Sequence, residues 1–154
     1  MIATEHQINS IDSGRVLAVD PGSRRIGIAL SDPTRTVASP LSVIKHVSLI
    51  DDCQTIINWC MDNDVSLILV GIALSEDGTE NPAMRHATKV ATQLQEMTTI
   101  PVILWDESGS TLQAKADGVA AKKSRKNRAG HMDEHAAAVI LQSYLESIHR
   151  EEMS

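Results

Sequence analysis

The sequence predicts an α/β domain built on a mixed five-stranded sheet with helices on both faces. Three strand-like segments joined by short links come first, and helical and strand-like segments then alternate. The run "SLILVGIAL" (66–74) is continuously apolar, which is typical of a strand covered on both faces. The length of 154 residues suits one domain. We expect residues 15–150 to form it and residues 1–14 to be a flexible arm.

The three leading segments are rich in strand-forming residues. "RVLAVD" (15–20) and "IGIALSD" (26–32) flank a Pro-Gly turn, and "TVASPLSVI" (36–44) follows closely. Because their links are short, we expect these strands to be antiparallel to their neighbours.

Capping residues predict where the helices begin. Ser48 and Asp51 form a capping pair for a helix to about Met61, and Asn81 precedes a proline that suits the first turn of a second helix. Apolar spacing predicts the inward residues of these two helices: Ile50, Cys53, Ile57 and Cys60 in the first, and Ala87, Val90, Ala91, Leu94 and Met97 in the second. Cys53 and Cys60 lie two helical turns apart, too far for a disulfide, so we expect reduced core residues.

The carboxyl-terminal third continues the alternation. "IPVILW" (100–105) is the last predicted strand, and Ser110 can cap a short helix to about Ala121. A final helix from about Met132 has a predicted inward side consisting of Ala136, Val139, Ile140, Tyr144 and Ile148.

Composition restricts the possible functions. The net charge is −6, yet five of the fourteen basic residues lie in "KKSRKNR" (122–128), which predicts either a local polyanion-binding segment or a solvated loop. An aromatic content of 2% excludes a stacking platform for single-stranded nucleic acid. The sequence indicates no signal peptide and no membrane span, so we expect a cytoplasmic protein.

Acidic residues stand at the expected carboxyl ends of two strands. Asp20 ends the first strand, and Asp106 and Glu107 end the last, although only one of that pair can face Asp20. Asp133 lies in the first turn of the final helix. A turn, a solvated strand end or a helix dipole explains each acid alone. Together they would repel one another unless divalent cations neutralised them, which indicates a Mg²⁺ site acting on a phosphodiester.

Four blocks of the sequence resemble the YqgF family, whose members are assigned to Holliday junction resolution and to trimming of precursor 16S ribosomal RNA. The blocks span about residues 15–146 and are "AVDPGSRRIGIALSDP", "LILVGIALSEDGTE", "PVILWDES" and "KKSRKNRAGHMDEHAAAVILQSYLE". The resemblance implies an RNase H-like fold, three α/β/α layers around a mixed five-stranded sheet whose first three strands are antiparallel and the rest parallel.

The resemblance also implies functional residues. Asp20, Glu107 and Asp133 would hold two Mg²⁺ or Mn²⁺ ions for hydrolysis of structured nucleic acid. The expected substrate is the 5′ end of precursor 16S rRNA, with a Holliday junction as the alternative. Gly22 and Gly27 would let the backbone approach the ligand. Flanking phosphates would contact a basic set made up of Arg24, Arg25, Lys122, Lys123, Arg125, Lys126 and Arg128.

Two positions depart from the family pattern. Ser108 and Gly109 replace the usual arginine and bulky residue after the Asp-Glu pair, and Ala73 replaces a proline. Loss of the arginine could weaken binding, change specificity or abolish cleavage. A non-cleaving nucleic-acid-binding module is therefore a second hypothesis.

Two further alternatives come from short motifs. "HMDEH" satisfies the zinc-protease pattern His131-x-x-Glu134-His135, with Glu146, Glu151 or Glu152 as a third ligand, but such short patterns recur by chance. The strand-Asp-x-Gly opening also occurs in sugar-kinase and actin-like ATPases, whose two domains need a longer chain. Symmetric junction cleavage would require a homodimer, whereas end trimming requires only a monomer.

Overall fold

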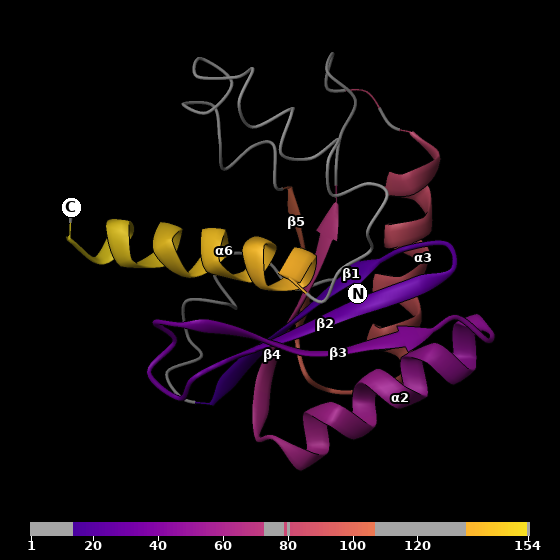
Figure 1. Ribbon diagram of the computed structural model, residues 1–154, viewed down its shortest axis with the longest axis horizontal. Helices are drawn as coiled ribbons and strands as arrows, with labels where there is room; N and C mark the ends of the chain where they lie inside the picture. The colour runs from indigo at the N-terminus through magenta and orange to yellow at the C-terminus, as the bar shows by residue number, and fades with distance from the viewer. Residues whose placement is uncertain (1–13, 73–78, 80, 107–134, 154) are drawn as a thin grey trace.

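A computed structural model describes residues 14–72, 79, 81–106 and 135–153. Five strands and three helices occupy this part of the chain (Figure 1). Their order and bounds are β1 (Arg15–Pro21), β2 (Arg25–Ser31), β3 (Ala38–Lys45), α2 (Leu49–Asp62), β4 (Val65–Ile72), α3 (Pro82–Met97), β5 (Val102–Asp106) and α6 (His135–Met153).

The strands form one mixed sheet in the order β3-β2-β1-β4-β5. β1 pairs with β2 and β2 with β3 in antiparallel fashion, whereas β1 with β4 and β4 with β5 are parallel. The predicted mixed sheet is therefore confirmed. The parallel arrangement brings the carboxyl ends of β1, β4 and β5 to one edge, which is called the carboxyl edge below.

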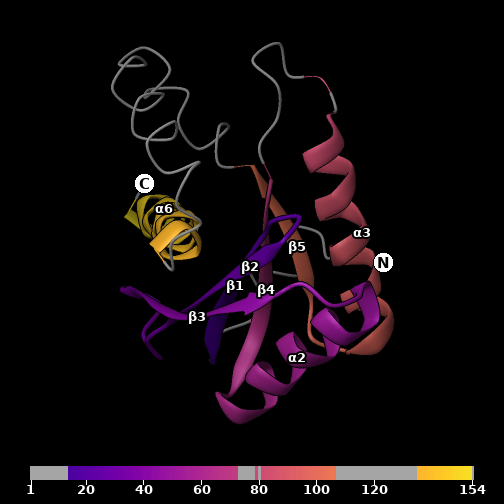
Figure 2. The same ribbon diagram turned by 45° about the vertical axis from the view of Figure 1, so that its right-hand side comes forward.

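Helices cover both faces of the sheet. α2 and α3 lie on one face and α6 on the other, as the two views show (Figures 1 and 2). The face under α6 is called the α6 face. The buried residues accordingly form two clusters, a larger one under α2 and α3 and a smaller one under α6. This confirms the three-layer arrangement.

β4 shows why a continuous apolar run predicts a strand covered twice. Leu67 and Leu69 belong to the cluster under α6, and Ile68 and Val70 belong to the cluster under α2 and α3. All four side chains have no exposed surface, because successive residues point to opposite faces and both faces are covered.

The predicted helix starts are confirmed by the capping hydrogen bonds. The Ser48 hydroxyl accepts from the Asp51 backbone N–H at 3.1 Å, and the Asn81 side-chain oxygen accepts from the Met84 backbone N–H at 2.9 Å. Pro82 opens α3, where its missing N–H costs no helical hydrogen bond. The Ser110 helix lies outside the described residues.

Two predicted inward residues are instead exposed. Ile50 is 61% exposed because it lies in the first turn of α2, at the margin of the buried stripe. Val139 of α6 is 43% exposed, because the stripe that faces the sheet follows a neighbouring helical row. That row consists of Ala137, Ile140, Leu141, Tyr144 and Leu145.

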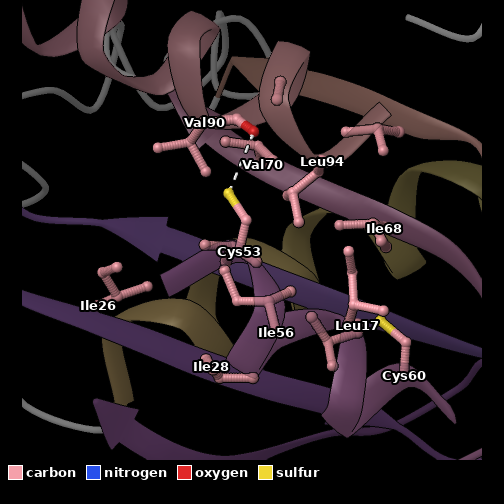
Figure 3. Packing of buried hydrophobic residues seen from close by; sticks show 14 of the residues in the cluster. Leu17, Ile26, Ile28, Cys53, Ile56, Cys60, Ile68, Val70, Val90 and Leu94 are labelled. Carbon is pink, nitrogen blue, oxygen red and sulfur yellow. Dashed lines mark hydrogen bonds between the residues drawn. The ribbon is translucent and has the colours of Figure 1, made fainter. Parts of the chain in front are cut away.

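The larger core contains both cysteines. Cys53 and Cys60 are buried and free, as predicted, and their sulfurs lie among aliphatic side chains (Figure 3). The Cys53 thiol points to the Val90 carbonyl oxygen of α3 at 3.9 Å, so it lies at the contact between α2 and α3.

Candidate active site at the carboxyl edge of the sheet

Asp20 is the described acid at the centre of the candidate site. It is half-buried near the end of β1, where it pairs with Gly27 of β2. Pro21 and Gly22 then turn the chain, and the Gly22 N–H donates to the Asp20 carbonyl oxygen at 3.1 Å. That amide is therefore already engaged in the turn. A paired strand end and a closed turn together hold the Asp20 backbone rigidly.

The space beside Asp20 exists because residue 27 is glycine. A Cβ built on Gly27 would lie 3.6 Å from the Asp20 Cβ and 3.5 Å from the Ala137 Cβ of α6. Asp20 therefore faces α6, and the start of the helix lies over this part of the sheet. A side chain larger than alanine at position 27 would crowd both Asp20 and Ala137.

A second glycine lets α6 lie close to the sheet on the other side of Asp20. Gly71 of β4 lies one residue beyond the pair Val19 and Val70, and so next to Asp20 in the sheet. A Cβ on Gly71 would approach Ile140 Cδ1 to 2.7 Å, closer than real Cβ contacts. The two glycines flank Asp20 and bring the first turns of α6 down onto the sheet at this point.

The direction of Asp106 decides which member of the acid pair can join Asp20. Ile103 belongs to the cluster under α6 and Trp105 packs against it, whereas Val102 and Leu104 lie on the opposite side. Strand alternation therefore directs Asp106 away from the α6 face that Asp20 occupies.

Trp105 links the end of β5 to α6. Its indole N–H donates to the Ser143 hydroxyl at 2.9 Å, and its ring meets Tyr144 edge to face, with 5.3 Å between ring centres. Burial raises the pKa of Tyr144 to about 12, so the phenol is neutral near pH 7. These contacts hold the end of β5 against α6.

The predicted arginines lie at the same edge as Asp20, and an unpredicted lysine joins them. Arg24 and Arg25 are exposed at the β1–β2 turn. Lys45, also exposed, pairs directly with Arg25 across β2 and β3. Sequence reasoning missed Lys45 because it lies 20 positions further along the chain. The alternation and register of the third strand could have suggested it.

Several predicted site residues lie outside the described residues. They are Glu107, Asp133, Lys122, Lys123, Arg125, Lys126 and Arg128, together with the departures Ala73, Ser108 and Gly109 and the zinc-motif residues His131 and Glu134. The described part of α6 begins at His135, two positions after Asp133. Within the described ranges, no three His, Cys, Asp or Glu side chains form a group suited to a metal ion.

Residues 14–147 match the model of the RuvX family, described as Holliday junction resolvases. The chain belongs to the RuvX (YqgF) family. This confirms the resemblance drawn from the four sequence blocks.

Relatives of the chain match it over most of their length. A protein of Roseiflexus sp. (strain RS-1), which carries the provisional name pre-16S rRNA nuclease, is 36% identical over 138 residues, covering 90% of this chain and 98% of that protein. A protein of Paracoccus denitrificans (strain Pd 1222) with the same provisional name is 35% identical over 136 residues, covering 88% of this chain and 86% of that protein.

Solved structures identify the fold. Thermus thermophilus RuvC is similar with a TM-score of 0.57 at 14% identity, covering 88% of this chain and 96% of that chain. The same protein in complex with a Holliday junction gives 0.56 at 11% identity, covering 90% and 96%. At these identities the likeness concerns the fold, and it confirms the RNase H-like class. Among the described helices, none combines the length and apolar character needed to span a membrane.

Proposed function

We propose that this member of the RuvX family is a metal-dependent nuclease that trims the 5′ end of precursor 16S rRNA. The provisional names of the relatives support the substrate. The observation that carries the proposal is the position of Asp20, fixed at a strand end beneath the start of α6 and next to a glycine on β2.

The proposed metal ligands are Asp20, Glu107 and Asp133. Asp20 offers the carboxylate oxygen that Mg²⁺ and Mn²⁺ prefer, and the absence of a side chain at Gly27 keeps its neighbour on β2 from crowding it. Strand alternation favours Glu107 over Asp106, and the seat of α6 on Gly27 and Gly71 favours Asp133 near Asp20. One or two bound ions would supply Lewis acidity and a reactive water at neutral pH.

The remaining residues position the nucleic acid. Arg24 and Arg25 stand exposed at the edge that holds Asp20, where they would bind phosphates next to the scissile bond without reading the bases. We propose the same role for the basic run at 122–128. The rigid β1–β2 turn keeps Asp20 at a constant distance from these contacts, which favours one reactive alignment of the backbone.

Holliday junction resolution is the second candidate function. The description of the family and the fold of RuvC favour it. Both substrates present phosphates to the same acidic site, so the chemistry at Asp20 would be alike. A junction resolvase would in addition need two copies of the chain to cut symmetrically, whereas end trimming would need one.

The test compares three forms of the protein on both substrates. Parent, Asp20→Asn and Asp106→Asn proteins are incubated with a precursor 16S rRNA fragment and a four-way DNA junction, with Mg²⁺, Mn²⁺ or chelator. Asp106→Asn is the matched control, because Asp106 ends a strand at the same edge but faces the other side of the sheet.

We expect the parent to cut the rRNA precursor only with metal. Groups that merely orient a metal ligand are worth about 10- to 100-fold, so Asp20→Asn should lose at least about 100-fold of the rate. Asp106→Asn should keep most activity. Cleavage of the junction alone would favour resolution. Binding without any cleavage by the parent would contradict the nuclease proposal and favour the non-cleaving module.

A further inference from the structure

We propose that Lys45 completes a phosphate-binding edge with Arg24 and Arg25, and that this edge holds the backbone of a double-stranded arm next to the cleavage site. The phosphate-binding edge is defined as these three side chains. The inference rests on the proposed nuclease function for its location, and it adds a residue and a substrate class to it.

The sheet register places Arg25 and Lys45 side by side. They are direct partners across β2 and β3, and such partners have Cβ atoms about 5 Å apart on the same face. Ile26 belongs to the cluster on the opposite face, so its two neighbours in β2, Arg25 and Gly27, point to the α6 face. Asp20 lies on that face too. Arg25 and Lys45 therefore border the α6 face beside Asp20.

Two like charges directly opposite each other destabilise a sheet unless something neutralises them. The side chains of Arg24, Arg25 and Lys45 make no hydrogen bond or ion pair with any residue that the structure describes. All three are exposed. A phosphate backbone would relieve this repulsion, because each contact pairs a cation with a phosphate and releases a counterion.

The backbone beneath these side chains is held firmly. The His46 N–H donates to the Arg24 carbonyl oxygen at 2.8 Å, which joins the end of β3 to the β1–β2 turn. The buried carboxylate of Asp52 then accepts from the Val47 N–H at 3.0 Å and bonds the Nδ1 atom of His46. The backbone that carries the phosphate-binding edge is therefore held in place before any ligand binds.

The distance from the phosphate-binding edge to Asp20 suits one strand of a nucleic-acid duplex. Neighbouring strands lie about 4.8 Å apart and residues rise about 3.3 Å along a strand. Asp20 is level with Gly27 and Val43, and Lys45 lies two strands away and two residues further along, so the two residues are separated by roughly 12 Å. A nucleic-acid strand in a duplex rises about 3.4 Å per nucleotide along the axis. Lys45 therefore lies about three to four nucleotides from the proposed cleavage point.

The aromatic residues favour a duplex over a single strand. The whole chain has two Trp, one Tyr and no Phe, namely Trp59, Trp105 and Tyr144. Trp59 packs against the core from α2, and the other two pack against each other under α6. These three rings are packed away from the phosphate-binding edge, and the His46 ring next to Lys45 is bonded to Asp52. The edge therefore offers mainly charges, and a duplex presents a regular phosphate backbone to them.

The experiment measures binding, so it does not depend on cleavage. Lys45→Ala and Lys89→Ala are made in the Asp20→Asn background, and the affinity for a labelled blunt RNA duplex, and for one of its strands alone, is measured across a range of salt. Lys89 is the matched control, since it is an exposed lysine on α3 and loses the same charge. Thermal unfolding checks that both variants fold.

We expect Lys45→Ala to weaken duplex binding by about threefold to tenfold at moderate salt and to reduce the slope of log affinity against log salt by about 0.9. Lys89→Ala should leave the slope unchanged. An unchanged slope for Lys45→Ala, or an equal change for Lys89→Ala, would overturn the inference. An equal loss on the single strand would overturn the duplex assignment. If the parent protein cuts nothing but the Lys45 effect is present, the nuclease proposal fails and this inference stands.

Discussion

At the scale of single residues, the site depends on the pairing of an acid with a glycine. Asp20 and Gly27 are partners in the sheet, and because Gly27 has no side chain, Ala137 of α6 and the Cβ of Asp20 both lie close to that position. The pair shows how a short β1–β2 hairpin can present a carboxylate under a helix without burying it. The half-buried position of Asp20 follows from this arrangement.

Substitution of Gly27 tests this arrangement. A Cβ would make ordinary contacts at 3.5 and 3.6 Å, so Gly27→Ala should change the free energy of unfolding by less than about 1 kcal/mol. Gly27→Val must place two further carbons between Asp20 and Ala137. We expect it to cost about 1–3 kcal/mol and to reduce cleavage more strongly than alanine does. Urea unfolding and the cleavage assay measure both, and equal stability of the two variants would contradict the expected crowding.

At the scale of elements, the site depends on how closely α6 lies on the sheet. α6 contacts β1, β2 and β3 through one stripe of side chains, and Ile140 of that stripe occupies the space over Gly71. Packed interiors tolerate little added volume. The angle and height of α6, and with them the approach of its start to Asp20, therefore depend on a glycine in β4.

The contact between Gly71 and Ile140 predicts a compensating pair. Gly71→Ala would bring a methyl group to 2.7 Å from Ile140 Cδ1, and we expect a cost of about 1–3 kcal/mol in the free energy of unfolding. Ile140→Val removes that Cδ1 atom and alone should cost about 0.5–1.5 kcal/mol. The double variant should be more stable than the sum of the two costs by at least about 0.5 kcal/mol in urea unfolding. Strict additivity would mean that α6 moves freely away from the sheet.

At the scale of the whole molecule, the larger core unites α2, α3 and the sheet. Cys53 and Cys60 lie within it with almost no exposed surface (Figure 3). Burial, with a smaller effect from the Asp52 carboxylate, raises the pKa of the Cys53 thiol to about 11, and burial raises that of Cys60 to about 12. A raised thiol pKa lowers the thiolate fraction at any given pH, so both cysteines should be inert in the folded protein.

Thiol alkylation therefore reports unfolding of the whole core. At pH 8 in native buffer we expect iodoacetamide to modify neither cysteine, and in urea above the unfolding midpoint we expect it to modify both together. Mass spectrometry counts the labels, and circular dichroism monitors the fold under the same conditions. Labelling of either cysteine while the circular dichroism signal stays native would contradict the buried, protonated state.

Much of the fold was predictable because its signals are local. The Pro-Gly turn, the caps at Ser48 and Asn81 and the apolar run of β4 each act within a few residues of themselves. The burial of Ile50 and Val139 was predicted wrongly. Helical spacing identifies rows of apolar residues along a helix, but packing against the neighbouring elements determines which of two adjacent rows is buried. The ligand roles of Glu107 and Asp133 stay predictions.

By itself, the sequence determined the order of the strands and helices, the mixed pairing of the sheet and the position of Asp20 at a strand end, since these follow from local periodicity and turn chemistry. Tertiary structure alone decided that Asp106 turns away from Asp20, that Lys45 lies beside Arg25, and that Gly71 receives Ile140. These facts depend on the register of the strands and on where α6 packs on the sheet. Both are set by the packing of segments that are distant in the chain, where no local pattern can specify them.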